Sequence, residues 1–314
     1  MIETVGLTKR YRDRIALADL NLKIDQGDVF GFIGPNGAGK STTIKILATL
    51  LRPTAGIARV AGYSVDTGTK DIRRAMGYMP DFFGLYDDLT VREYLEFFAA
   101  AYKIRGKART KVIDDVLSLV DLAHRADTQI DALSRGMQQR LSLARVLLHD
   151  PAVLLLDEPA SGLDPRARVE FREIIKELRK MGKTVLISSH ILPELADMCT
   201  KVGIIEKGRL VASGSVEDVI ARAQGDRWVH FEVSTEAANA VEDARKIAAM
   251  TPGVLAVEDD PSRPGRLRAR LDPGADPSQI PTAIIGSGLR LVFYEEEHID
   301  LEDAFMRLTQ GIVS

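Results

Sequence analysis

Eight consecutive residues, from Gly34 to Ser41, have the types and spacing that bind phosphate, and they fit the pattern G-x-x-x-x-G-K-[S/T] at every fixed position. Glycines let successive backbone N–H groups turn toward phosphate oxygens, and Lys40 adds a mobile positive charge. The hydroxyl of Ser41 is suited to ligate the Mg²⁺ that bridges β- and γ-phosphates. The alternative is a glycine-rich turn with an incidental lysine. The pattern favours a nucleoside triphosphate site whose predicted contacts are Gly34, Pro35, Asn36, Gly37, Ala38, Gly39, Lys40, Ser41 and Thr42.

Two acidic residues, Asp157 and Glu158, follow the apolar run 153–156. A carboxylate at the end of a buried strand can hold Mg²⁺, directly or through water, so Asp157 is a predicted metal ligand. Glu158 would then face the γ-phosphate as the general base for an attacking water. His190, beyond the apolar run 184–187, is a predicted γ-phosphate contact. Alone, the acidic pair would be a solvated strand end and the histidine a structural residue.

The elements that must position these groups can be predicted from apolar runs. The run 29–33 predicts a strand before the glycine loop, and 41–51 a helix after it. The runs 153–156, 184–187 and 202–205 predict further strands of a parallel sheet covered on both faces. Because such sheets bind ligands at the carboxyl ends of their strands, the polar residues that follow them should converge on the loop.

A largely helical segment separates the glycine loop from Asp157. Thr90 and Glu93 form a capping box for a helix to about Tyr102, with Gly106 as its predicted stop. Residues 111–120 are also predicted to be helical. Beyond Asp157, Pro165 should open a long helix that ends at Lys180.

Length and composition indicate two domains and a chain without a membrane span. The 314 residues include no run of eighteen apolar residues and no secretory leader, and the single cysteine, Cys199, suits a structural role in a reducing cytoplasm. From Asp226 onward, 9 Lys and Arg face 16 Asp and Glu, whereas the first 225 residues have a net charge of +4. No dense basic patch is evident, so a nucleic-acid partner is not expected.

After Gly225 the pattern restarts as a second domain. Strands are expected at 228–233, 254–258, 267–271 and 291–295, with helices at 237–250, 278–285 and 301–308. The order β-α-β-β-α-β is typical of a ferredoxin-like unit.

Taken together, these motifs resemble the ATP-binding subunits of ABC transporters over nearly the whole chain. Residues 133–137 stand where that family has its LSGGQ signature, and 161–164 resemble its D-loop. His190 resembles the switch histidine, and Tyr11 the aromatic residue that stacks on adenine. The resemblance implies that Ser134, Gly136 and Asp164 contact ATP held by an opposite subunit, so that a homodimer or a paired ATPase subunit encloses two ATP molecules. Ser134 also fits the cap of a helix beginning near Gly136.

The chain departs from the family pattern at two places. Asp81 stands where the family has its Q-loop glutamine, and we expect it to reach Mg²⁺ or a water bound to it. In the signature, Arg135 replaces the first glycine and Met137 the glutamine. The aromatic segment 82–86 is either a docking surface for a helix of a membrane partner or local packing.

The resulting expectation is an α/β fold, a P-loop NTPase of ABC type, with a small C-terminal α+β domain. Residues 1–222 would form the ATP-binding domain, with a helical subdomain at about 82–148, and residues 226–314 the ferredoxin-like accessory domain. We expect an ATPase that uses ATP and Mg²⁺ to power export through transmembrane permease subunits, located in the cytoplasm on the inner face of the membrane. The alternatives are a soluble ABC ATPase acting on ribosomes or nucleic acid, and a regulatory nucleotide-binding module.

Overall fold

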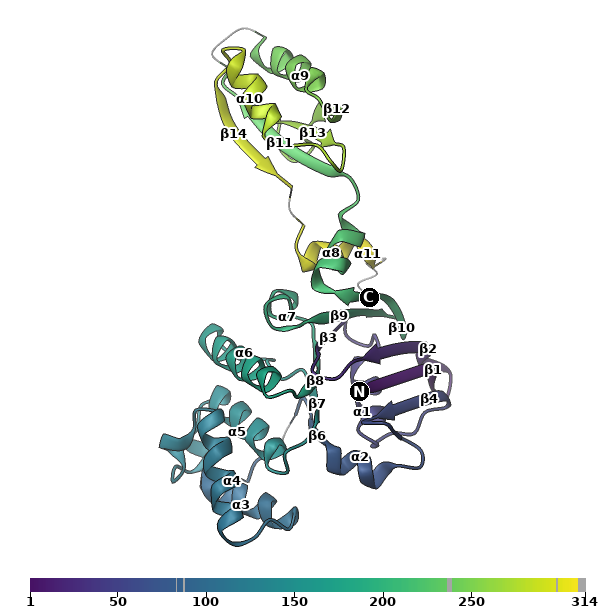
Figure 1. The fold of residues 1–314 in the computed structure, drawn as a ribbon, viewed down its shortest axis with the longest axis vertical. Helices are drawn as coiled ribbons and strands as arrows, with labels where there is room; N and C mark the ends of the chain where they lie inside the picture. Colours follow the sequence, from purple (N-terminus) through teal and green to yellow (C-terminus); the bar gives the residue numbers. More distant parts are fainter. Residues whose placement is uncertain (83, 87, 236–238, 298, 310–314) are drawn as a thin grey trace. The chain divides into compact units, whose positions relative to one another are not determined.

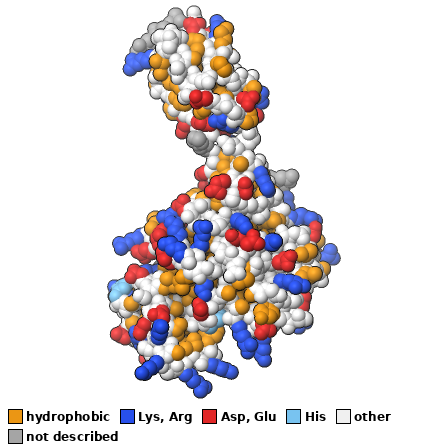
Figure 2. Space-filling view, in the orientation of Figure 1, with side chains coloured by type: hydrophobic (Ala, Val, Ile, Leu, Met, Phe, Trp, Pro, Cys, Tyr) orange, Lys and Arg blue, Asp and Glu red, His pale blue; other side chains and the backbone are white. Residues whose placement is uncertain are grey.

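A computed structural model describes residues 1–82, 84–86, 88–235, 239–297 and 299–309 (Figure 1). Its described residues form two compact units, one made of residues 1–219 with 305–309, the other of residues 220–304. No helix among the described residues combines the length and apolar character needed to cross a membrane. On the face shown in Figure 2, basic and acidic side chains are interspersed.

A six-stranded sheet forms the centre of the first unit. Its strand order is β10-β9-β3-β8-β7-β6, and neighbouring strands are parallel except for β10 and β9. The strands are β3 (Val29–Ile33), β6 (Met76–Met79), β7 (Val153–Asp157), β8 (Thr184–Ser189), β9 (Lys201–Glu206) and β10 (Arg209–Ser215). Every residue of β3, β7 and β8 is buried, which confirms the parallel strands predicted from continuous apolar runs.

An antiparallel sheet of order β2-β1-β4-β5 lies beside the central sheet. Its strands are β1 (Ile2–Tyr11), β2 (Arg14–Ile24), β4 (Ala55–Val60) and β5 (Tyr63–Ser64). Side chains of both sheets and of α1 (Lys40–Leu47) share one hydrophobic core, which includes Leu17, Phe30 and Ile44. This core fixes the start of α1 against the end of β3.

Helices cover the other side of the central sheet (Figure 1). They are α5 (Arg135–Leu147), α6 (Pro165–Lys180) and α7 (Leu192–Met198), whereas α3 (Val91–Ala101) and α4 (Gly106–Leu119) pack against α5, away from the sheet. Helix α2 (Thr69–Ala75) precedes β6 and α8 (Val216–Gln224) follows β10, and short 3-10 helices span Ala123–Arg125 and Ile130–Ala132. The Thr90–Glu93 capping box is present, and Pro165 opens α6 as predicted. The prediction that Gly106 stops the preceding helix is wrong: α3 ends at Ala101, Lys103 just beyond it adopts the left-handed φ of 64°, and Gly106 begins α4.

The second unit has the predicted β-α-β-β-α-β order. Its strands β11 (Arg227–Val233), β12 (Val254–Asp259), β13 (Leu267–Leu271) and β14 (Leu291–Glu296) form an antiparallel sheet of order β12-β13-β11-β14. Helices α9 (Ala240–Met250) and α10 (Gln279–Gly286) share a hydrophobic core with this sheet. The helix predicted from residue 237 begins outside the described residues. Helix α11 (Leu301–Leu308) is present as predicted, and from Phe305 its residues belong to the first unit.

Candidate functional site

The glycine loop between β3 and α1 has a shape that other residues would not allow. A Cβ atom at Gly34 would collide with the carbonyl oxygen of Ile205, and one at Gly39 would lie 2.8 Å from the carbonyl oxygen of Ala16. Gly39 also has φ 115°, where side chains are strained. The loop leads directly into the N-terminus of α1, and the free N–H groups at a helix N-terminus favour anions in general.

Lys40 is held inside this loop. Its ammonium group donates hydrogen bonds to the carbonyl oxygens of Gly34 (2.5 Å) and Pro35 (3.4 Å). The same Nζ lies 3.4 Å from Oε1 of Glu158, and Lys40 is buried. The side chain is therefore positioned in the loop, with a carboxylate as its counter-charge.

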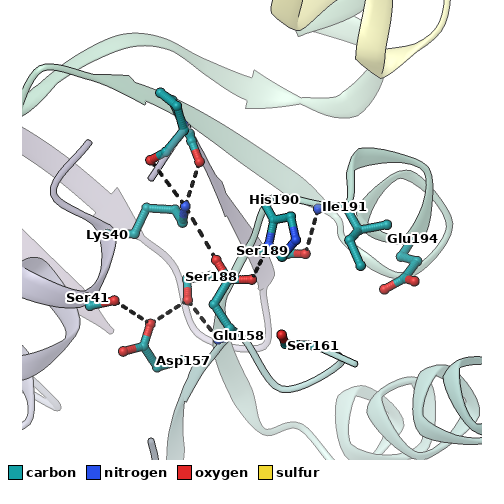
Figure 3. A network of polar contacts seen from close by, with 12 residues as sticks. Lys40, Ser41, Asp157, Glu158, Ser161, Ser188, Ser189, His190, Ile191 and Glu194 are labelled. Atoms are coloured by element: carbon teal, nitrogen blue, oxygen red, sulfur yellow. Dashed lines mark hydrogen bonds and ion pairs between the residues drawn. The ribbon is translucent and has the colours of Figure 1, made fainter. Parts of the chain in front are cut away.

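A second set of polar contacts runs from Ser41 to Glu158 (Figure 3). The hydroxyls of Ser41 and Ser188 both donate to Oδ1 of Asp157, at 3.0 and 2.7 Å. The backbone N–H of Glu158 donates to Oγ of Ser188 at 2.9 Å. Because Asp157 and Ser188 are paired residues of the adjacent strands β7 and β8, the sheet register itself brings these groups together.

Glu158 connects the two sets of contacts. Its Oε2 lies 2.7 Å from Nδ1 of His190, opposite the oxygen that faces Lys40. Its φ is 51°, a left-handed conformation that costs a glutamate about 1–3 kcal/mol and persists where the surroundings fix it. The predicted catalytic residues Lys40, Glu158 and His190 thus lie in one row (Figure 3).

These residues line a cavity of about 670 Å³. Among the predicted residues, the described lining includes Tyr11, Pro35, Asn36, Gly37, Gly39, Lys40, Ser41, Thr42, Asp81, Glu158 and His190. Asp157 lies behind Ser41 and is 2% exposed. Tyr11 is partly exposed, with Lys9 above its ring at 5.1 Å.

Asp81 contributes a further acidic group to the cavity wall. Burial raises the pKa of its carboxyl, and the negative charges of Asp157 and Glu158 raise it further, against the opposing effect of Arg135 and His190. The cavity wall thus holds two carboxylates, Asp81 and Glu158, beside two basic side chains, Arg14 and Lys40. The described residues contain no cluster of three or more His, Cys, Asp or Glu side chains able to hold a metal without other ligands.

Ser134, Gly136 and Asp164 are not among the described residues that line this cavity. Ser134 caps α5 by accepting a hydrogen bond from the backbone N–H of Met137 (3.4 Å), and Asp164 caps α6 through the N–H of Ala167 (2.8 Å). Helix α5 begins at Arg135, one residue before the predicted start. In the single chain these residues shape helix termini, and their contact with a nucleotide stays a prediction.

Ser188 is the functional candidate that the sequence analysis missed. The signal was its place at the polar end of an apolar strand, two residues before His190. Arg14 and Ser161 also line the cavity, and Arg14 lies 3.5 Å from the carbonyl oxygen of Gly37. No sequence pattern singled out Arg14.

The aromatic segment 82–86 lies partly outside the described residues, because Phe83 is not described. Tyr86 packs against the rings of Tyr94, Phe97 and Phe98 with centroid distances of 5.7–6.5 Å. Tyr86 thus has local packing partners, but its side chain is also 52% exposed, so both interpretations stay open for this residue. Phe82 is 87% exposed, and its docking role stays a prediction.

Comparisons with known proteins agree with this geometry. Residues 17–161 match the ABC transporter family. The probable multidrug ABC transporter ATP-binding protein YbhF of Escherichia coli K12 is 40% identical over 226 residues, which are 72% of this chain and 39% of that protein. The chain thus spans well under half of that relative.

A second relative matches along nearly its whole length. The Nod factor export ATP-binding protein I of Burkholderia orbicola AU 1054 is 33% identical over 313 residues, covering 98% of this chain and 96% of that protein. Among solved structures, the dimeric ATP-binding cassette MJ0796, in a post-hydrolysis state bound to ADP and Pi, has a TM-score of 0.62. It is 28% identical and covers 68% of this chain and 98% of that one.

Proposed function

Since the chain belongs to the ATP-binding proteins of ABC transporters, we propose that it binds and hydrolyses Mg-ATP in the cavity around Lys40 and thereby powers export through separate membrane subunits. The observation that carries the proposal is the convergence of Lys40, the Ser41–Asp157 pair and the Glu158–His190 pair on one cavity.

Phosphate binding is assigned to the glycine loop and the start of α1. Their N–H groups and the positive end of the helix dipole attract the β- and γ-phosphates. Lys40 is already in the loop, so its ammonium group can exchange the Glu158 carboxylate for phosphate oxygens. Tyr11 borders the same cavity, and we assign it to adenine stacking.

Oxygen ligands suited to Mg²⁺ lie beside this loop. The Ser41 hydroxyl and the Asp157 carboxylate are hard oxygen donors 3.0 Å apart, the ligand type that Mg²⁺ prefers when it also binds phosphates and waters. We assign both to the metal, and Asp81 to the metal or its water. When bound, Mg²⁺ neutralises charge on the β- and γ-oxygens.

Glu158 is proposed as the general base. Its carboxylate can orient a water and accept its proton as the water attacks the γ-phosphate. His190 touches the outer oxygen of Glu158 and can steady this carboxylate. We assign His190 a γ-phosphate contact as well.

The working assembly is proposed to be a dimer. Ser134, Gly136 and Asp164 lie at helix N-termini outside the chain's own cavity, which suits them to contact a nucleotide bound by a second subunit. The relative MJ0796 is itself dimeric. Transmembrane permease subunits would hold the dimer at the inner face of the membrane.

The domain division is part of the proposal. Residues 1–222 are assigned to ATP binding and residues 226–314 to an accessory domain. The alignment with the Nod factor export protein extends through both, so the accessory segment accompanies an ATP-binding domain in that exporter protein too.

Two substitutions test the proposed chemistry. Glu158→Gln should preserve ATP binding and lower turnover by about 10²–10⁴-fold, the usual contribution of a general base. Lys40→Ala should weaken ATP binding itself. Calorimetric titration with ATP and a phosphate-release assay separate the two effects, and unchanged turnover in Glu158→Gln would remove this residue from the base role.

The membrane partner is tested by purifying the tagged chain in mild detergent from its native cells. A stoichiometric polytopic membrane protein supports the transporter assignment. Ribosomal or DNA-bound proteins in its place would instead support a soluble ABC ATPase.

A further inference from the structure

The loop between Glu158 and α6, residues 159–164, is held by side chains from two helices; we name it the base loop. Three of its carbonyl oxygens each accept a side-chain hydrogen bond. The pairs are Gln139 to Pro159, Arg135 to Ser161 (3.2 Å) and Arg168 to Leu163 (2.9 Å). Gln139 and Arg135 belong to α5 and Arg168 to α6, so the base loop is tied to both helices.

Arg135 holds the middle of the base loop. Besides its bond to Ser161, its guanidinium lies against Gly162: a Cβ atom there would be 2.5 Å from Cζ of Arg135. Gly162 has φ 70°, a backbone conformation that favours glycine. The absence of a side chain there lets the guanidinium of Arg135, the first residue of α5, lie directly against the backbone of the loop.

The base loop begins at a strained residue. Glu158 adopts φ 51°, and a left-handed glutamate keeps this conformation only where its surroundings over-determine it. On one side Ser188 fixes the backbone N–H of Glu158. On the other side the base loop must be fixed as well, since Ser161 donates its N–H to the carbonyl oxygen of Glu158 at 3.1 Å. Arg135 binds the carbonyl of that same Ser161.

We propose that Arg135 is a positioning residue that fixes the base loop and, through Ser161, holds the carboxylate of Glu158 in place for hydrolysis. The inference rests on the proposed function. It concerns a residue at which the chain departs from the family signature, where a glycine is usual and no side chain could make this contact. Arg135 thus ties the start of α5 to the general base within one chain.

The kinetic test compares Arg135→Ala and Arg135→Gly with the wild-type chain. Both variants should lower kcat about fivefold, the rate equivalent of one ordinary hydrogen bond, with KM for ATP unchanged within about twofold. KM should hold because the contacts of Lys40 and Ser41 do not involve Arg135. Arg135→Lys should recover only part of kcat, since an ammonium group keeps the charge but not the planar fork.

The matched control is Arg74→Ala. Arg74 is an exposed helical arginine whose ion pair, with Asp71 at 3.7 Å, stays within α2, so the control should leave kcat and KM unchanged. A kcat of Arg135→Ala equal to that of the control, or a raised KM with unchanged kcat, would overturn the inference.

A second measurement does not depend on turnover. The amides of Ser161 and Leu163 are hydrogen-bonded within the base loop and its junction with Glu158. Their hydrogen exchange should accelerate about fivefold or more in Arg135→Ala and stay unchanged in Arg74→Ala. Unchanged exchange in Arg135→Ala would refute the positioning role. A wild-type chain that bound ATP without hydrolysing it would refute the proposed function. The hydrogen-exchange measurement would still decide whether Arg135 fixes the base loop.

Discussion

The buried hydroxyl of Ser188 should contribute measurably to the stability of the first unit. Ser188→Ala removes a hydrogen bond of 2.7 Å to the Asp157 carboxylate, with both residues almost completely buried. Hydrogen bonds to charged groups contribute about 1.5–3 kcal/mol. Glu158 would keep a bond from its N–H to the Ser188 carbonyl oxygen (3.2 Å), so no backbone donor is orphaned. We therefore expect a loss of about 2 kcal/mol in the free energy of unfolding.

Urea unfolding can measure this loss of stability separately in each of the two units. Far-UV circular dichroism reports both units, whereas Trp228, the single tryptophan of the chain, lies in the second unit and reports on it. With an m-value of about 3 kcal/mol/M, the midpoint of the first unit should fall by about 0.7 M. The Trp228 transition should not move.

Ser189→Ala is the matched control for Ser188→Ala. Ser189 is the next residue of β8, is also buried, and accepts one neutral hydrogen bond from the N–H of Ile191 at 3.0 Å. Its loss should cost about 0.5–1.5 kcal/mol. Equal losses in the two variants, or additive effects of Ser188→Ala and Asp157→Asn within about 0.5 kcal/mol, would refute the reasoning from a charged hydrogen bond.

Two further predictions concern pH. Burial and neighbouring carboxylates raise the pKa of Asp81, so its charged form destabilises the folded chain above that pKa; Asp81→Asn should raise the melting temperature at pH 7–8, and the gain should fade as pH falls through the raised pKa. In the second unit, burial alone would raise the pKa of Asp260, but hydrogen bonds from Ser262 and the contact with His230 outweigh it and lower the pKa to about 2. Asp260 therefore stabilises its unit above about pH 4, a contribution lost as pH falls toward 2, and Trp228 fluorescence should show that Asp260→Asn removes this pH dependence.

The site residues that could be predicted from sequence are those whose role depends only on their neighbours in the chain. At Gly34 and Gly39 a Cβ atom would collide with backbone atoms, so only glycine fits these positions. The residue type itself therefore reveals the tight loop. Asp157 and Glu158 could be placed because a buried strand of a parallel sheet must end at the ligand edge. For these residues, the sequence a few positions to either side is enough to indicate the role.

Ser188 could not be assigned in this way. Its role depends on the register that pairs it with Asp157, 31 residues away in sequence, and no local pattern specifies that register. The stop assigned to Gly106 was wrong for a related reason: Lys103 adopts the left-handed conformation usually taken by glycine, which its residue type does not reveal. The antiparallel sheet also went unassigned, and the register shifts in β1 disturb the alternation that would have identified it.

The ion pair between Lys40 and Glu158 has a consequence for experiments that trap ATP-bound ABC proteins. The Glu158 carboxylate lies 3.4 Å from the Lys40 ammonium group, so it competes with a phosphate for this positive charge from within the molecule. Replacing Glu158 by glutamine removes this internal competitor, so nucleotide should be retained more tightly even where no hydrolysis occurs. Tight retention of nucleotide in that variant therefore has two causes. Turnover is slower, and Lys40 no longer forms an ion pair with residue 158, so it is free to bind phosphate. Comparing its affinity with that of the wild-type chain for a non-hydrolysable ATP analogue separates them.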